Sequence, residues 1–178
     1  MSIINFLILN NITMKSIFLK TILIINLFFI YNCKAQTTND YINFYNDVVP
    51  KLNTIVPIKT QFYGQSFSSF YNELQNKNIN IVLISYDVKD DTRNELYVLK
   101  LYFGNMNMWN IASDNSSFWF PSVDITFENE IPSQIKDMVR QYQGQWNPTF
   151  LQFFSSMKIE KIEFISINGY NSSDRAVK

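Results

Sequence analysis

Along this chain the spacing of apolar residues changes between a helical and a strand-like period, and the order of these changes restricts the fold. Two segments with helical spacing come first, followed by three strand-like segments, two more helical segments and a last strand-like segment. Because helices and strands do not alternate one by one, this order favours an antiparallel sheet packed against helices over a parallel sheet. The sequence therefore predicts an α+β domain with about four antiparallel strands, in the order α-α-β-β-β-α-α-β.

The predicted strands differ in the number of faces that they bury. They cover 79–88, 95–103, 123–130 and 159–167. The first is apolar on both faces, which predicts a central strand, and the second returns beside it as an antiparallel hairpin. The third alternates, with Val123, Ile125 and Phe127 on one face and polar residues on the other. It therefore predicts a strand with one solvated face.

The predicted helices are marked by caps and by helix breakers. A first helix begins after Thr37 and meets Pro50, where it either ends near Val48 or restarts with the proline in its first turn. The other helices run from Ser66 to about Asn76, from Pro132 to a stop at Gly144, and onward from Asn147. The segment from 104 to 117 is rich in Asn and Ser, and we expect a long, partly packed loop there.

The first thirty-five residues predict an export signal. A start at Met14 places Lys15 and Lys20 before a short apolar run at 21–31, which is the arrangement of a secretory signal. The run is shorter than the roughly 20 apolar residues that cross a bilayer. We therefore expect an export signal over 1–35, a single domain over 36–167 and a flexible tail over 168–178.

Cys33 leaves two routes by which the signal could be processed. The residues before it, 30–32, resemble a lipoprotein box, in which the cysteine is lipidated and becomes the new N-terminus. The alternative is cleavage before Gln36 at a small-x-small site formed by 33–35. Lipidation is favoured because Cys33 is the only cysteine in the chain. Either route predicts an exported protein, in the periplasm or as a lipoprotein of the outer membrane. Only the first route gives contact with a membrane, through a lipid on Cys33.

The residues after Cys33 contain neither cysteine nor histidine, and this excludes several kinds of site. Nucleophilic systems of the Ser-His-Asp or Cys-His type cannot be assembled, and neither can zinc or copper sites built on imidazole or thiolate. We expect no cofactor, because no cofactor-binding loop is recognisable. With 15 basic and 15 acidic residues and no basic cluster, the chain is not expected to bind nucleic acid.

Three tryptophans are the candidate ligand-binding residues. Trp109, Trp119 and Trp146 lie in or beside predicted loops and have aromatic or amide side chains next to them. Such rings can stack on sugars or anchor a protein interface. They can also fold back as lids over the core, so the sequence leaves both interpretations open.

Three carboxylates are the other candidates. Asp124, Glu128 and Glu130 fall on the polar face of the predicted strand 123–130, about 7 Å apart for neighbours on that face. Carboxylates at such distances can act as acid and base or bind Ca²⁺. The simpler interpretation is the solvated face of an amphipathic strand.

These observations lead to three hypotheses about function. The first is a non-catalytic exported protein that binds another protein of the cell envelope, as an inhibitor or an immunity protein does. The second is a glycan- or ligand-binding module that uses the three tryptophans, and the third is a carboxylate-dependent hydrolase. A flat apolar patch would favour the first, exposed coplanar tryptophans the second, and an acidic cleft the third.

Overall fold

The computed structural model describes residues 20–21, 37–89 and 95–178. The chain divides into two units, Met1–Ala35 and Gln36–Lys178. The first is described only at Lys20 and Thr21, which are helical, so the rest of the predicted signal, including Cys33, lies outside the described residues. Within the described ranges, no helix has the length and apolar character needed to cross a membrane.

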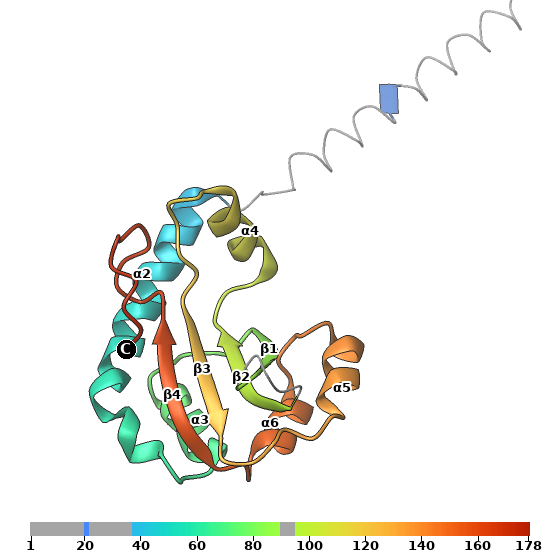
Figure 1. The fold of residues 1–178 in the computed structure, drawn as a ribbon. Helices are drawn as coiled ribbons and strands as arrows, with labels where there is room; N and C mark the ends of the chain where they lie inside the picture. The colour runs from blue at the N-terminus through green and yellow to red at the C-terminus, as the bar shows by residue number, and fades with distance from the viewer. Residues whose placement is uncertain (1–19, 22–36, 90–94) are drawn as a thin grey trace, which may run out of the picture. The chain divides into compact units, whose positions relative to one another are not determined.

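The second unit is an α+β domain, and the predicted fold class is confirmed. Its sheet is antiparallel and has the order β1-β2-β3-β4 (Figure 1). The strands are β1 Leu83–Val88, β2 Leu96–Tyr102, β3 Ser122–Phe127 and β4 Ile159–Ile165. The helices are α2 Thr38–Ile55, the 3-10 helix η1 Val56–Phe62, α3 Phe67–Asn76, α4 Met106–Asp114, α5 Ile135–Tyr142 and α6 Pro148–Phe154.

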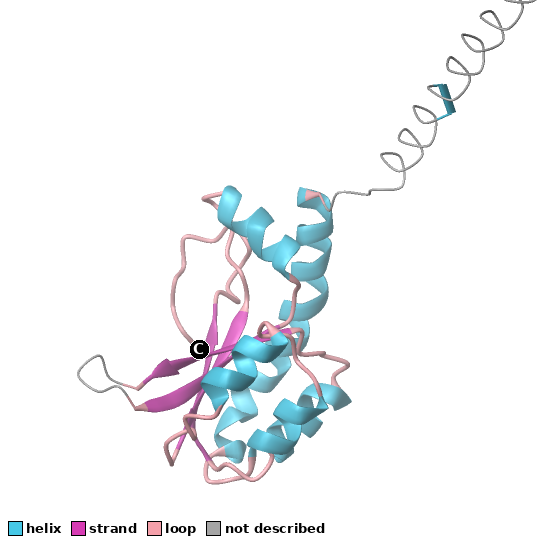
Figure 2. Ribbon diagram, turned by 90° about the vertical axis from the view of Figure 1, so that its right-hand side faces the viewer, coloured by secondary structure: helices cyan, strands magenta, loops and turns pink. Residues whose placement is uncertain are grey.

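The helices gather mainly on one side of the sheet, as Figure 2 shows. On that side Phe127 of β3 stacks on Phe154 of α6 at 5.7 Å and meets Phe67 of α3 edge-on at 6.2 Å. All three rings are fully buried. The burial of such rings is the main source of stability for this layer.

The strand register separates the two faces of the sheet. On the helix-covered face, Leu101, Val123 and Phe164 are partners across β2, β3 and β4, and all are fully buried. One residue along, Lys100, Asp124 and Glu163 form the corresponding row on the opposite face. We call this second face, which carries polar and charged side chains, the open face.

Two helices differ from the sequence predictions. The first helix neither ends nor restarts at Pro50 but continues through it to Ile55. A proline inside a helix costs about 3 kcal/mol, and burial of Leu52 and Ile55 beyond it offsets this cost. The segment from 104 to 117 is not a loop throughout, because it contains α4, which Asn105 caps by accepting a hydrogen bond from the Met108 backbone N–H at 3.0 Å.

The hairpin of β1 and β2 is confirmed, but β1 is an edge strand and not a central one. Its outer edge is covered by a short segment, since the Ile84 N–H donates to Gly144 and the Trp146 N–H donates to Val82. The approach is close, because a Cβ at Gly144 would lie 2.9 Å from the Ile84 carbonyl oxygen. Two of the apolar residues that predicted a central strand, Ile79 and Ile81, lie before β1 and are buried there.

The C-terminal segment runs back along the domain and forms hydrogen bonds with it. The backbones of Phe164 in β4 and Lys178 exchange two hydrogen bonds, of 2.7 and 3.0 Å. The Tyr45 hydroxyl donates to Ser166 at 2.7 Å and accepts from the Gly169 N–H at 2.9 Å. This segment therefore covers part of the β4 edge and is tied to α2.

Candidate functional site

A cleft of about 380 Å³ lies where α4 and the loop after it meet the open face of the sheet. Its floor comes from β2 and β3 and includes Lys100, Ser122 and Asp124. Its walls are mostly aromatic and include Tyr102, Trp109, Phe118, Trp119 and Phe120. Aromatic walls with a few polar groups are typical of sites that bind small molecules.

Trp109 is the most accessible ring of this cleft, with 39% of its surface exposed. It meets Tyr102 edge-on at 5.3 Å and lies 5.1 Å from Phe120. Phe120 in turn stacks on Phe44 of α2 at 5.6 Å. Trp109 is thus supported from both the sheet and α2, so an incoming group would meet a ring that is already oriented.

Trp119 is fixed by its backbone and by the C-terminal segment. Its N–H donates to the Tyr170 carbonyl at 2.8 Å, and its carbonyl accepts a hydrogen bond from the Tyr41 hydroxyl. Burial raises the pKa of Tyr41 far above its ordinary value, which keeps this donor protonated. The Arg175 guanidinium lies 3.0 Å from the centre of the Trp119 ring.

Trp146 belongs to a different part of the molecule. It packs among the rings of Phe67, Tyr71 and Phe150. It lines a separate hollow of about 540 Å³ beside β1. The structure thus brings two of the three candidate tryptophans to one cleft and places the third against the helices.

Asp124 is the charged residue with the most unusual environment on the open face. Its Oδ1 atom is buried and meets no hydrogen-bond donor among the described residues. Burial raises the pKa of Asp124 to about 6, against the opposing effect of Lys100, while Glu163 and Asp87 raise it further. Close to neutral pH this carboxylate is therefore charged but poorly compensated.

The neighbours of Asp124 are engaged with each other. Lys100 Nζ lies 2.6 Å from Asp87 Oδ2, and Lys161 Nζ lies 2.7 Å from Glu163 Oε1. The hydrogen bond from Lys100 holds the pKa of Asp87 below its ordinary value. Burial would lower the pKa of Lys100, but the bond to Asp87 and the charge of Asp124 raise it overall. Asp124 thus has the Lys100–Asp87 and Lys161–Glu163 ion pairs as neighbours and takes part in neither.

A charged groove of about 410 Å³ continues from the aromatic cleft along the open face. It shares Lys100 and Asp124 with the cleft and extends to Lys161 and Glu163. At its far end Lys89 forms an ion pair with Glu160, with 2.5 Å between Nζ and Oε2. Ligands that enter the cleft therefore meet an aromatic end and a charged end.

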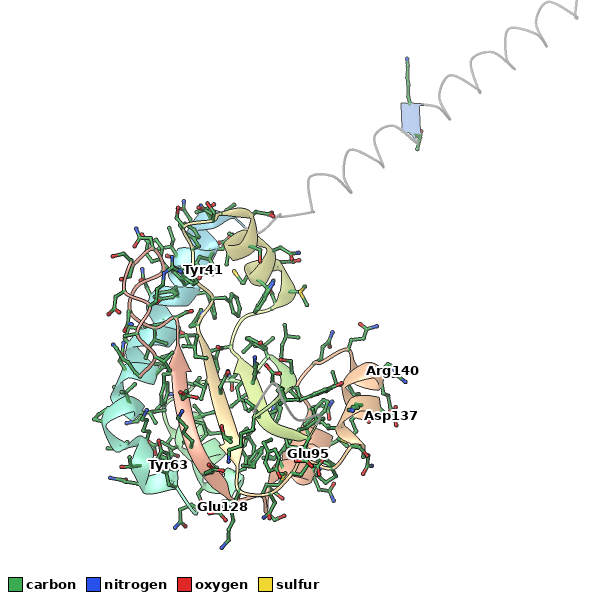
Figure 3. All side chains as sticks on the ribbon, viewed as in Figure 1. Tyr41, Tyr63, Glu95, Glu128, Asp137 and Arg140 are labelled. Atoms are coloured by element: carbon green, nitrogen blue, oxygen red, sulfur yellow. The ribbon has the colours of Figure 1, made fainter. Side chains whose placement is uncertain are left out.

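Glu128 and Glu130 do not share a strand face with Asp124. β3 ends at Phe127, and both glutamates are exposed beyond it. The register between β3 and β4 shifts between Thr126 and Phe127, which interrupts the strand alternation before Glu128 is reached. In Figure 3 Glu128 lies at the opposite end of the domain from Tyr41, which contacts the cleft residue Trp119. The strand predicted for 123–130 therefore ends three residues early, and the three-carboxylate face does not form.

Other potential sites are limited. Within the described ranges, no group of three or more acidic, cysteine or histidine residues is placed to bind a metal ion. Searches of protein families, of curated proteins and of solved structures found no match for this chain. The cleft is therefore interpreted from its own chemistry.

Sequence analysis named Trp109, Trp119 and Asp124 but missed Lys100 and Tyr102. Both lie in β2 and alternate with the buried Leu99 and Leu101. That alternation is visible in the sequence and predicts a face that points away from the core. The segment that packs against this face is not predictable from its own residues, because α4 buries only Met108 and Ala112 and so lacks a clear apolar stripe.

Proposed function

We propose that this chain is an exported, non-catalytic binding protein that holds a small ligand in the cleft between α4 and the open face. The observation that carries the proposal is one cleft lined by both the exposed ring of Trp109 and the partly buried carboxylate of Asp124, whose Oδ1 atom meets no hydrogen-bond donor among the described residues. Its volume of about 380 Å³ falls within the range of about 300 to 1,000 Å³ for small-ligand sites.

Binding is favoured over hydrolysis because Asp124 has no second carboxylate ready to act with it. Asp87 and Glu163 are both engaged by lysines, at 2.6 and 2.7 Å. Glu128 and Glu130 lie beyond the end of β3. A carboxylate-dependent hydrolase needs an acid and a base on the two sides of a bond, and the cleft offers a single carboxylate for that role.

A protein partner is the second candidate, and α4 carries the observation that favours it. The large apolar side chains with the greatest exposure in the described part of the chain are Met106, Trp109 and Val177. Met106 and Trp109 are three residues apart on α4 and so lie on the same side of this helix. An envelope protein that binds as an inhibitor or immunity partner would cover both side chains.

A ligand screen with two variants separates these candidates. A panel of sugars and small metabolites is tested by thermal shift on the protein, on Trp109→Ala and on Met106→Ala. A ligand of the cleft should stabilise the protein and Met106→Ala but not Trp109→Ala. If the same ligand stabilised Trp109→Ala equally, the cleft would not be its site. If a purified protein partner binds the protein but does not bind Met106→Ala, the second candidate is favoured.

Export is also part of the proposal, and it rests on the order of charged, apolar and cleavage regions before residue 36. Mass spectrometry of protein from its native host should find an N-terminus at Cys33 or at Gln36. If Cys33 is lipidated, Cys33→Ser should release the protein from the membrane fraction, because the multiple acyl chains of a lipoprotein anchor firmly. An intact N-terminus at Met1 or Met14 would contradict export.

A further inference from the structure

We infer that the cleft recognises its ligand through a cationic group, an ammonium or a guanidinium, held by Asp124 within the aromatic walls. The inference rests on the proposed function and names the chemical class of its ligand. Three features of the cleft support it, namely the charge on the open face, the unpartnered oxygen and the aromatic rings.

The charges around Asp124 do not balance. Across β1 to β4 the open face carries the acids Asp87, Asp124 and Glu163 and the bases Lys100 and Lys161. The two lysines form ion pairs with Asp87 and Glu163, so the charge of Asp124 is the one left without a partner in this group. A ligand with a single positive charge would neutralise the row, whereas an anion would meet an uncompensated carboxylate.

The Oδ1 atom of Asp124 also lacks a hydrogen bond. A buried acceptor without a donor is costly to the folded state, and such groups call for a ligand, an ion or water. Lys100 lies opposite Asp124 on the neighbouring strand, but the Nζ atom of Lys100 bonds to Asp87. An ammonium or guanidinium supplies N–H donors and a positive charge together, and hydrogen bonds of that kind are strong.

The aromatic walls suit the same group. The face of an aromatic ring carries negative electrostatic potential and attracts cations. One ring of this cleft already has a cation over its face, since the Arg175 guanidinium lies 3.0 Å from the centre of the Trp119 ring. The exposed ring of Trp109 offers a further aromatic surface to an entering ligand. A neutral sugar could stack there but would leave the charge of Asp124 uncompensated.

Two pairs of probes that differ mainly in charge test the inference. Butylammonium is compared with butanol, and glucosamine with glucose, in tryptophan-fluorescence titrations of the protein at pH 7.5. Each cationic probe should bind at least about tenfold more tightly than its neutral counterpart, which is the selectivity expected of a carboxylate in an aromatic site. The preference should disappear in Asp124→Asn. It should persist in Asp137→Asn, which removes an exposed acid of α5 (Figure 3).

Acidic pH provides a second readout that needs no variant. The carboxyl group of Asp124 has a pKa of about 6, and the groups that face it are Lys100, Glu163 and Asp87. At pH 5 about nine in ten of these carboxyls are protonated, so the affinity for butylammonium should fall about tenfold relative to pH 7.5. Binding of butanol should not change in this range.

The outcomes separate the inference from the function on which it rests. Equal binding of each charged and neutral pair overturns the inference, as does an unchanged preference in Asp124→Asn or the absence of any binding by the cationic probes. If glucose binds as tightly as glucosamine and Trp109→Ala weakens the binding of both, the ligand-binding function stands and only the inference of a cationic ligand is wrong. If a ligand binds and Trp109→Ala has no effect on it, the proposed function of the cleft fails as well.

Discussion

The helix-covered face and the open face of the sheet come from the same strands, yet different forces shape them. On β3, Val123, Ile125 and Phe127 are fully buried against the helices, whereas Asp124 points to the open face between two ion pairs. Apolar burial makes the first face the main source of stability. The second face holds a carboxylate that is costly at neutral pH. The comparison separates a face that stabilises the fold from a face whose carboxylate opposes folding at neutral pH, and the second face is the one where we propose that a ligand binds.

Phe127→Ala should give the largest effect, because it removes a ring from the helix-covered face. The ring stacks on Phe154 at 5.7 Å and is fully buried. Truncating a buried Phe to Ala costs about 3 to 5 kcal/mol, a large share of the roughly 5 to 15 kcal/mol that stabilises a domain. Urea melts measure the loss. A variant of nearly unchanged stability would show that this face does not dominate folding.

Asp124→Asn should stabilise the domain at neutral pH. The pKa of Asp124 in the folded state, about 6, lies above its ordinary value of 3.8, so the folded state binds more protons between these values. The contribution of this group to stability therefore falls as the pH rises from about 4 to about 6. Removing the charge should add about 1 kcal/mol at pH 7, after allowance for partial exposure, and almost nothing at pH 3.5.

Urea melts of the protein and of Asp124→Asn at both pH values check this prediction. Asp124→Asn should gain stability at pH 7 and lose affinity for a cationic probe. That result would show that the open face gives up stability for binding. A destabilised Asp124→Asn at pH 7 would mean that the carboxylate is already well compensated by its neighbours.

Asp87→Asn should have a smaller effect of the opposite sign. The hydrogen bond from Lys100 lowers the pKa of Asp87 below its ordinary value, so its contribution to stability is present above that value and is lost as the pH falls. Because the Asp87 side chain is about half exposed and solvent screens its ion pair, the loss at pH 7 should be about 0.5 kcal/mol. Urea melts at pH 7 and pH 3 measure it. A gain at pH 7 would contradict the assignment of the Lys100 ion pair.

Glu128→Ala should have the smallest effect, because Glu128 belongs to neither face. It is exposed beyond the end of β3, and surface substitutions of this kind change stability by no more than about 0.5 kcal/mol. The same urea melts serve as the measurement. A strong effect in either direction would show that this glutamate lies in a constrained environment and would revive it as a site residue.

Local signals in the sequence predicted most of the fold. The cap at Thr37 forms with Asp40 as a capping box, and Asn147 caps α6 before Pro148. The alternation along β3 also put its apolar side chains on the buried face. Such signals succeed because each depends on residues within one or two turns or strand repeats.

The errors concern the parts of the domain that depend on distant contacts. α4 buries only Met108 and Ala112, so its apolar stripe is too narrow to be recognised among the Asn, Ser and Asp around it. The predicted strand 79–88 looks like a central strand because it includes Ile79 and Ile81, which are buried but precede β1, and a loop segment at Gly144 covers the edge of β1. The packing of α4 and the cover over the edge of β1 both depend on residues elsewhere in the chain, so neither can be predicted from the residues of the element alone.

The α+β class, the antiparallel sheet and the alternation of apolar and polar side chains on β3 could all be predicted from the chain, because they follow from local spacing and from the order of the segments. The candidate site could not, because its residues meet only in the folded domain. Asp124, Lys100 and Trp109 come from β3, β2 and α4, and the cleft exists because the strand register and the packing of α4 bring them together. The raised pKa of Asp124 has the same origin, because the residues that bury this carboxyl and carry charge near it are remote from it along the chain.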